Sequence, residues 1–115
     1  MIKRIDRVNE LIKQELSKLI GEYFKPKDIL ITVTRVKTEP DLRSAEAFIS
    51  IFPFAKAEET LKQFKEILPR IQHILDGTIE LKYIPKIQLF LDESLEYESN
   101  IERLLDKIKD SKMKH

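Results

Sequence analysis

Apolar residues recur at three- and four-residue steps over the first part of the chain, which is the spacing of one face of a helix. This pattern predicts a helix from about Asp6 to Phe24, with Asp6 as its N-cap. Lys25-Pro26 should end the helix, because a residue before proline is disfavoured in the α region. The residues that form the apolar stripe are Ile5, Val8, Leu11, Ile12, Leu16, Leu19, Ile20 and Tyr23.

The next segment has the two-residue alternation of strands. The β-branched run Ile31–Lys37 predicts one strand, and Pro40-Asp41 predicts a sharp turn after it. In the second strand Ala45, Ala47, Ile49 and Ile51 alternate with Glu46, Phe48, Ser50 and Phe52, and Pro53 closes it. The aromatic residues Phe48, Phe52 and Phe54 could stack on nucleic-acid bases, but packing in a core is the favoured interpretation.

The second half of the chain predicts two helical segments and a third strand. A helix from about Ala57 should break at Pro69, and a further helix should stop at Asp76-Gly77. A strand from Ile79 to Leu91 follows, and Pro85 makes it an edge strand or a bulged one. A last acidic helix is predicted over residues 94–109, before a polar tail at 110–115.

The order helix, strand, strand, helix, helix, strand requires a right-handed crossover between the second and third strands. The second strand should then lie in the centre of a mixed three-stranded sheet covered by helices on one face. This is an α+β fold with the layout of a type II KH domain, plus a C-terminal helix. Residues 1–109 are predicted to form this single domain.

Composition narrows the function classes. The chain has 115 residues, 42% of them hydrophobic, and it contains no cysteine. No apolar run approaches the roughly 20 residues that a membrane span requires, which favours a cytoplasmic protein. The net charge is only +1, but the charges are unevenly placed: residues 1–43 carry ten Lys or Arg against seven acids, whereas residues 92–106 carry six acids against Arg103 alone.

Candidate chemistry is sparse. His73 lies on a predicted helix, and the chain has no cysteine and no second internal histidine that could pair with it. A partly exposed helical histidine is therefore favoured over a metal ligand or a general base. The acidic residues Asp92, Glu93, Glu96, Glu98 and Glu102 scatter around a helix axis, which favours a helix start over a Mg²⁺ site. We therefore expect no catalytic residue, no metal and no cofactor. A small hydrolase is a distant alternative, because the chain offers no convergent pair of catalytic groups.

A true KH domain holds a nucleic-acid backbone with a Gly-x-x-Gly loop between two helices. The only glycines of this chain are Gly21 and Gly77, so neither lies at the corresponding corner. This absence argues against ordinary single-strand binding by a KH domain.

The residues resemble the ribosome-binding factor A family over nearly the whole chain. The resemblance rests on Arg7-Val8, on Lys25-Pro26-Lys27, and on the stretch Leu81–Pro85 with the acidic run Leu91–Ser94. Within and beside the hairpin, Thr32, Thr34, Val36, Asp41 and Leu42 also match. The family has a helix kink with an Ala-x-Gly motif, which aligns here with Ile67, Leu68 and Pro69, so proline would supply the kink instead.

A set of basic residues on one face would bind RNA through its phosphates. Arg70 follows the predicted kink, and Gln72 or His73 takes the place of an arginine of the family. The predicted RNA-binding residues are Arg4, Arg7, Lys25, Lys27, Arg35, Arg43, Arg70 and His73.

The resemblance implies a non-enzymatic, monomeric factor that binds the immature small (30S) ribosomal subunit. It also implies help in maturation and processing of the 16S rRNA, growth in the cold, and a link to assembly GTPases. Two alternatives remain open. One is a generic RNA-binding module for other RNAs, and the other is a protein adapter that uses an apolar stripe at Leu95, Ile101 and Leu105 of the last helix.

Overall fold

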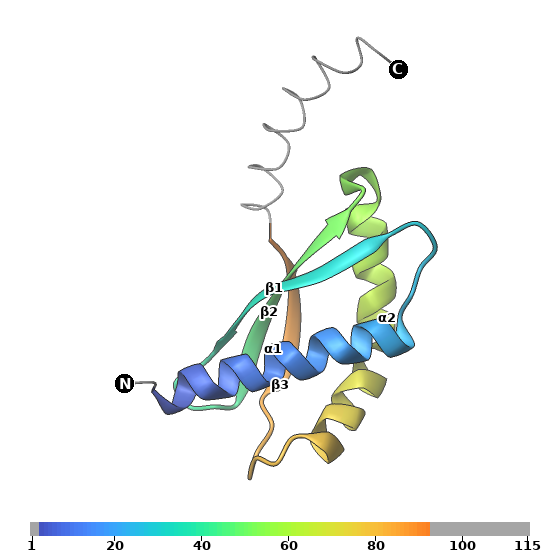
Figure 1. Ribbon diagram of the computed structural model, residues 1–115. Coiled ribbons are helices and arrows are strands. Elements are labelled where there is room, and N and C mark those ends of the chain that lie inside the picture. Colours follow the sequence, from blue (N-terminus) through green and yellow to red (C-terminus); the bar gives the residue numbers. More distant parts are fainter. Residues whose placement is uncertain (1–2, 93–115) are drawn as a thin grey trace, which may run out of the picture.

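Two helices cover one face of a three-stranded sheet in the computed structural model, which describes residues 3–92 (Figure 1). The elements are α1 (Arg4–Tyr23), β1 (Leu30–Thr38), β2 (Ser44–Phe52), a short 3₁₀ turn (Phe54–Lys56), α2 (Ala57–Thr78) and β3 (Lys86–Leu91). The predicted C-terminal helix 94–109 and the tail 110–115 lie outside the described residues.

The sheet has the order β1-β2-β3. β1 and β2 form an antiparallel hairpin, whereas β2 and β3 run parallel and are joined through α2. The register shifts between Val33 and Arg35, so Thr34 is the extra residue of a bulge in β1. The predicted mixed sheet with a central second strand is confirmed, and with it the α+β, KH-like fold class.

The core lies between the helices and one face of the sheet. The inward side chains of β2 are two alanines and two isoleucines, Ala45, Ala47, Ile49 and Ile51, and none exceeds 1% exposure. They contact a continuous apolar cluster that includes Ile12 and Leu16 from α1 and Phe64, Ile71 and Leu75 from α2. Strict alternation along β2 therefore assigns one of its faces to the core.

The start of α1 differs from the prediction. The helix begins at Arg4 with Lys3 at the N-cap position, and no side chain caps it. Asp6 lies in the first turn, where the positive end of the helix dipole favours a carboxylate without a capping hydrogen bond. The predicted end is confirmed, because the helix stops at Tyr23, shortly before Pro26.

The predicted pair of helices is one helix, α2, with Pro69 inside it. Proline removes one helical N–H donor, but Phe64 before it and Ile71 after it are both buried in the same core. This burial on both sides keeps the segment helical across the proline. The predicted stop at Gly77 is also wrong, since the helix continues to Thr78 and no glycine has a positive φ angle.

The third strand is shorter than predicted. β3 begins at Lys86, directly after Pro85, and residues 79–85 form a loop instead of a strand. The loop carries apolar side chains, because Ile79 is buried and Leu81 and Ile84 pack against the core. The expected edge position next to Pro85 is confirmed.

Candidate nucleic-acid interface

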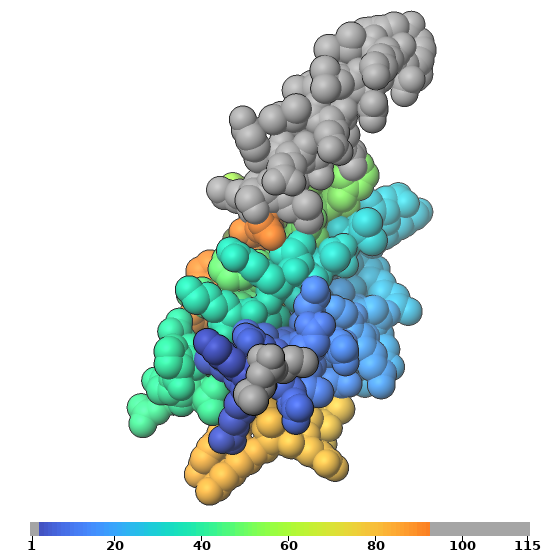
Figure 2. Space-filling view, turned by 60° about the vertical axis from the view of Figure 1, so that its left-hand side comes forward, coloured from blue at the N-terminus to red at the C-terminus, as the bar shows by residue number. Residues whose placement is uncertain are grey.

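A hollow of about 650 Å³ lies where three segments meet at one end of the molecule. The start of α1, the turn between β1 and β2, and the loop after α2 gather there (Figure 2). Its lining combines an apolar floor with basic and aromatic side chains, which are Arg4, Val8, Asp41, Leu42, Arg43, Leu81, Lys82, Tyr83, Ile84 and Pro85. We call this site the corner hollow.

The hairpin turn is built by local chemistry. The backbone N–H of Leu42 donates to the carbonyl of Glu39 over 2.8 Å, which places Pro40 at the second position of a β-turn, where its fixed φ is favourable. The carboxylate of Asp41 accepts a hydrogen bond from the backbone N–H of Arg43 at 3.0 Å. The predicted turn at Pro40-Asp41 is thus confirmed, and Asp41 acts in it as a turn former.

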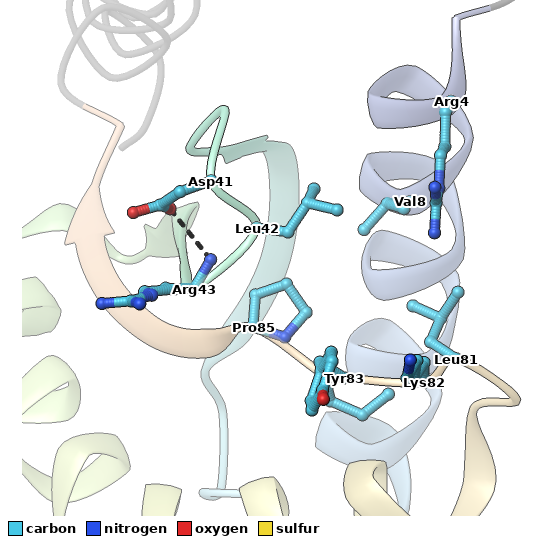
Figure 3. Close-up of a pocket in the computed structure, with 10 residues that line it drawn as sticks. Arg4, Val8, Asp41, Leu42, Arg43, Leu81, Lys82, Tyr83 and Pro85 are labelled. Atoms are coloured by element: carbon cyan, nitrogen blue, oxygen red, sulfur yellow. Dashed lines mark hydrogen bonds between the residues drawn. The ribbon is translucent and has the colours of Figure 1, made fainter.

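Leu42 has a left-handed backbone conformation, with φ of 62°. A residue other than glycine adopts this conformation at a cost of about 1–2 kcal/mol, because its Cβ comes too close to the following carbonyl oxygen. The strained backbone turns the Leu42 side chain toward Val8 of α1, across the floor of the corner hollow (Figure 3). The position of Leu42 on the apolar floor of the corner hollow therefore depends on a backbone conformation that sequence patterns do not reveal.

α1 is held in place next to the hairpin by Asn9. Its side-chain oxygen accepts a hydrogen bond of 2.8 Å from the backbone N–H of Thr38, the last residue of β1. This bond ties the first half of α1 to the strand end that leads into the turn. Arg4 is consequently carried at the rim of the corner hollow rather than at an arbitrary point of the surface.

Gln72 of α2 fixes the loop on the other side. Its Oε1 accepts the backbone N–H of Ile87 at 2.8 Å, and its Nε2 donates to the carbonyl of Pro85 at 3.1 Å. These two bonds join α2 to the start of β3, beside Pro85, which is fully buried. Gln72 therefore has a structural role, although the sequence pattern placed it among the alternatives for an RNA contact.

Replacing Gln72 with leucine should lower the free energy of unfolding by about 1 to 3 kcal/mol, because it leaves the Ile87 N–H and the Pro85 carbonyl without their partner. Urea unfolding followed by circular dichroism measures the change. The Gln63→Leu variant is the matched control, since Gln63 is exposed on the same helix. Equal stability losses in the two variants would contradict this role for Gln72.

The rim of the corner hollow carries two cations and an exposed ring. Arg4 extends along α1 toward Leu81 and Lys82 (Figure 3). Tyr83 is 73% exposed, and Nζ of Lys82 lies 5.7 Å from the centre of its ring. Arg43 also lines the hollow, but its side chain extends to the opposite side of the hairpin. Cations around an apolar floor can bind phosphate groups, and an exposed ring offers a stacking surface.

The other predicted cations lie elsewhere. Lys25 lines a second hollow of about 300 Å³ near the end of α1. Arg35 lies on the sheet, with its guanidinium carbon 4.1 Å from the centre of the Phe48 ring. Four further predicted residues are exposed and line neither hollow: Arg7, Lys27, Arg70 and His73. Of the predicted set, the structure thus brings only Arg4 and Arg43 to the corner hollow.

Sequence reasoning missed Lys82 and Tyr83 as site residues. Both lie in the stretch Leu81–Pro85, which the apolar alternation predicts as part of a strand and so as a packing segment. As a loop, the same residues present a cation and a ring to solvent, because both side chains are exposed. The sequence signal that could have identified them is a lysine and a tyrosine placed shortly before Pro85, which itself precedes the strand.

Across residues 3–92, no three His, Cys, Asp or Glu side chains are grouped in a way that could hold a metal ion. Within the same part of the chain, neither helix is both long enough and apolar enough to cross a membrane. The corner hollow itself is lined mainly by basic, aromatic and apolar side chains.

The fold and the corner hollow define the class of a small KH-like domain with basic side chains around a hollow at one corner. The particular family follows from comparison with known proteins. The family model described as ribosome-binding factor A matches residues 4–105, so the chain belongs to the ribosome-binding factor A family. Curated members support this: the protein of Opitutus terrae is 36% identical over 109 residues, covering 94% of this chain and 89% of its own length. That of Clostridium novyi is 37% identical over 112 residues, covering 95% and 93%.

Solved structures show the same fold at lower identity. The crystal structure of ribosome-binding factor A from Thermus thermophilus superposes with a TM-score of 0.69 at 17% identity, covering 77% of this chain and 97% of that one. A solution structure of a putative ribosome binding factor A from Thermotoga maritima gives a TM-score of 0.56 at 19% identity, covering 78% and 91%. These likenesses concern the fold alone.

Proposed function

We propose that this protein is a non-enzymatic assembly factor that binds the immature small (30S) ribosomal subunit. The observation that carries the proposal is the family match over residues 4–105. A homology model of the Thermus thermophilus ribosome binding factor A, similar in fold with a TM-score of 0.59 at 18% identity, has been fitted into the cryo-EM map of a complex of that factor with the 30S subunit. The corner hollow supplies a surface of suitable chemistry for RNA.

The mechanism rests on differential binding. A protein that binds one RNA conformation more tightly than another shifts the population toward the first by the difference in binding free energy, without chemistry. Arg4 and Lys82 bind phosphates in this mechanism, and the apolar floor with Tyr83 accepts a base or a sugar face. Recognition by shape then comes from the fixed spacing of the three segments around the hollow.

The finer parts of the proposal follow from the family. They are assistance in maturation and processing of 16S rRNA, support of growth in the cold, cooperation with assembly GTPases, and action as a cytoplasmic monomer. Residues 1–109 act as one RNA-binding domain. The remaining cations, Arg7, Lys25, Lys27, Arg35, Arg43 and Arg70, together with His73, contribute outlying contacts, and a kink at Ile67, Leu68 and Pro69 shapes the neighbouring surface.

Co-sedimentation tests the proposal. The purified protein is centrifuged with immature small subunits, mature small subunits, large subunits and bulk RNA, each at two salt concentrations. Preference for the immature small subunit that survives the higher salt supports the proposal, because shape-specific contacts persist when counterion release is weakened. Equal binding to all RNAs that disappears with salt would indicate a generic RNA-binding module instead. Absence of binding to every RNA would favour a protein adapter.

A further inference from the structure

The face of the sheet that the helices leave open carries a row of three stacked side chains. Arg35, Phe48 and Phe90 are direct neighbours across β1, β2 and β3 in the strand register. The rings of Phe48 and Phe90 lie 5.7 Å apart between centres, at an interplanar angle of 29°. The guanidinium of Arg35 lies over the other side of Phe48, 4.1 Å from the ring centre. The row is therefore a cation followed by two stacked rings.

This finding corrects the sequence interpretation of the aromatic residues. Phe48 and Phe52 belong to the face of β2 opposite the buried alanines and isoleucines, and Phe52 is 37% exposed. Phe54 lies in the 3₁₀ turn after β2, half-buried, with its ring edge-on to Phe52. Because both helices pack on the other face, none of these three side chains belongs to the buried core.

Phe90 ends the row at the border of the sheet. β3 is the last strand in the sheet order, so among residues 3–92 no strand lies beside the ring face of Phe90 that turns away from Phe48. The side chain is 40% exposed. Aromatic rings prefer offset stacking, and a third planar group can therefore extend the row on this outer face.

The neighbours of Phe90 along β3 are polar. Gln88 and Lys86 are exposed and share its face of the strand, because side chains two residues apart point the same way. Lys37 of β1 is also exposed on this face, whereas Glu46 between Lys37 and Gln88 is half-buried. The amide of Gln88, which can bond a base edge, is thus the next side chain on the face of Phe90, and the cations Lys86 and Lys37 lie farther along the same face of the sheet.

A peptide partner that adds a strand to this border is less favoured. Strand addition needs free backbone donors along the edge, and Pro85 has no N–H. The N–H of Ile87 is already bound to Gln72 at 2.8 Å. The start of the β3 edge is therefore closed to a peptide, while the ring face of Phe90 above it stays accessible.

We infer that the Arg35–Phe48–Phe90 row is a second RNA site, which takes one unpaired base on the outer face of Phe90. Gln88 bonds the base edge, and Lys86 contacts the flanking phosphate. The site is separate from the corner hollow and binds single-stranded RNA, since a paired base has no free face inside a helix. The inference rests on the proposed function, because it assumes that RNA is the partner.

The chain lacks tryptophan, so a Phe90→Trp variant has a single reporter at the site. Its tryptophan fluorescence should be quenched by a single-stranded oligoribonucleotide and not by the same sequence in a duplex. A Tyr83→Trp variant provides the comparison at the corner hollow. Absence of quenching in the Phe90→Trp variant at oligonucleotide concentrations that saturate binding, measured separately by anisotropy, would overturn the inference.

The Phe90→Leu variant tests the energy of the contact. It should weaken binding of the single-stranded oligonucleotide about tenfold or more, because stacking on an aromatic ring contributes about 1–3 kcal/mol per base. Phe52→Leu is the matched control on the same face and should leave the affinity unchanged. Unchanged oligonucleotide affinity in Phe90→Leu, with reduced co-sedimentation with subunits, would assign the face to a ribosomal protein and overturn the RNA site.

Subunit binding separates this inference from the proposed function. If wild-type protein sediments with small subunits but Phe90→Leu binds the oligonucleotide normally, only the second site is wrong. If the wild-type protein binds neither subunits nor the oligonucleotide, the proposed function and the second RNA site are both wrong.

Discussion

Replacing both Arg4 and Lys82 with glutamate should weaken binding to the immature small subunit at least tenfold at moderate salt. The two side chains come from α1 and from the loop after α2, and both line the corner hollow. Each phosphate contact that is lost means that one counterion fewer is released on binding. The plot of the logarithm of affinity against the logarithm of salt concentration should therefore become less steep, its slope changing by about two. The introduced carboxylates also repel phosphate. Sedimentation titrations over about 50 to 200 mM salt measure both quantities.

The double variant Lys62→Glu/Lys65→Glu is the matched control. It reverses the same number of charges at exposed positions of α2 that line neither hollow. The control should lose much less affinity, and both double variants should keep the helical signal of the wild type, because all four side chains are exposed. Equal losses in the two double variants would show that net charge, rather than the corner hollow, governs subunit binding.

Local chemistry made the hairpin predictable. Proline and aspartate at positions 40 and 41 favour one turn type, and the bonds from Leu42 to Glu39 and from Arg43 to Asp41 are those that this turn requires. The sheet order was predictable for a different reason, since a parallel connection through helices is right-handed in nearly all proteins. The hairpin turn thus follows from a rule that acts over a short segment, and the sheet order from a rule that acts on the whole topology.

The loop 79–85 was not predictable in this way. Its apolar side chains follow a two-residue alternation, but Leu81 donates its backbone N–H to the carbonyl of Ile79 at 3.0 Å, which folds the chain locally. Alternation reports which side chains contact the core, not whether the backbone pairs with a strand. Gln72 helps to fix where the strand begins, because its side chain binds the backbone of Pro85 and of Ile87, on both sides of Lys86.

The grouping of the cations depends on tertiary packing. Arg4 and Lys82 are far apart in the sequence, and both line the corner hollow because Asn9 holds α1 to β1 while Gln72 holds the loop to α2. Charge patterning along the chain identifies basic residues, but it gives no distance between them. The core assignment of the aromatic residues Phe48, Phe52 and Phe54 was wrong for a related reason, because β2 carries apolar residues on both faces and periodicity cannot tell which face the helices cover.

Replacing Phe64 with alanine should cause the largest loss of stability among these variants. Phe64 is fully buried, and its ring stacks on Phe24 with 5.3 Å between centres and 25° between planes. The contact joins the end of α1 to the first half of α2 beneath the sheet. Truncation of a buried phenylalanine costs about 3–5 kcal/mol, because the transfer free energy of the ring is lost and a cavity remains.

A loss of that size is a large part of the roughly 5–15 kcal/mol that usually holds a domain together, so the midpoint of thermal unfolding should fall by about 12 °C or more. Phe90→Ala is the matched control, since it deletes the same atoms from a ring that is 40% exposed. It should cost less than half as much in urea unfolding, because a half-exposed ring buries less area and leaves no closed cavity. A Phe90→Ala loss as large as that of Phe64→Ala would mean that the open face of the sheet is covered in solution, which would also remove the accessible ring that the second RNA site requires.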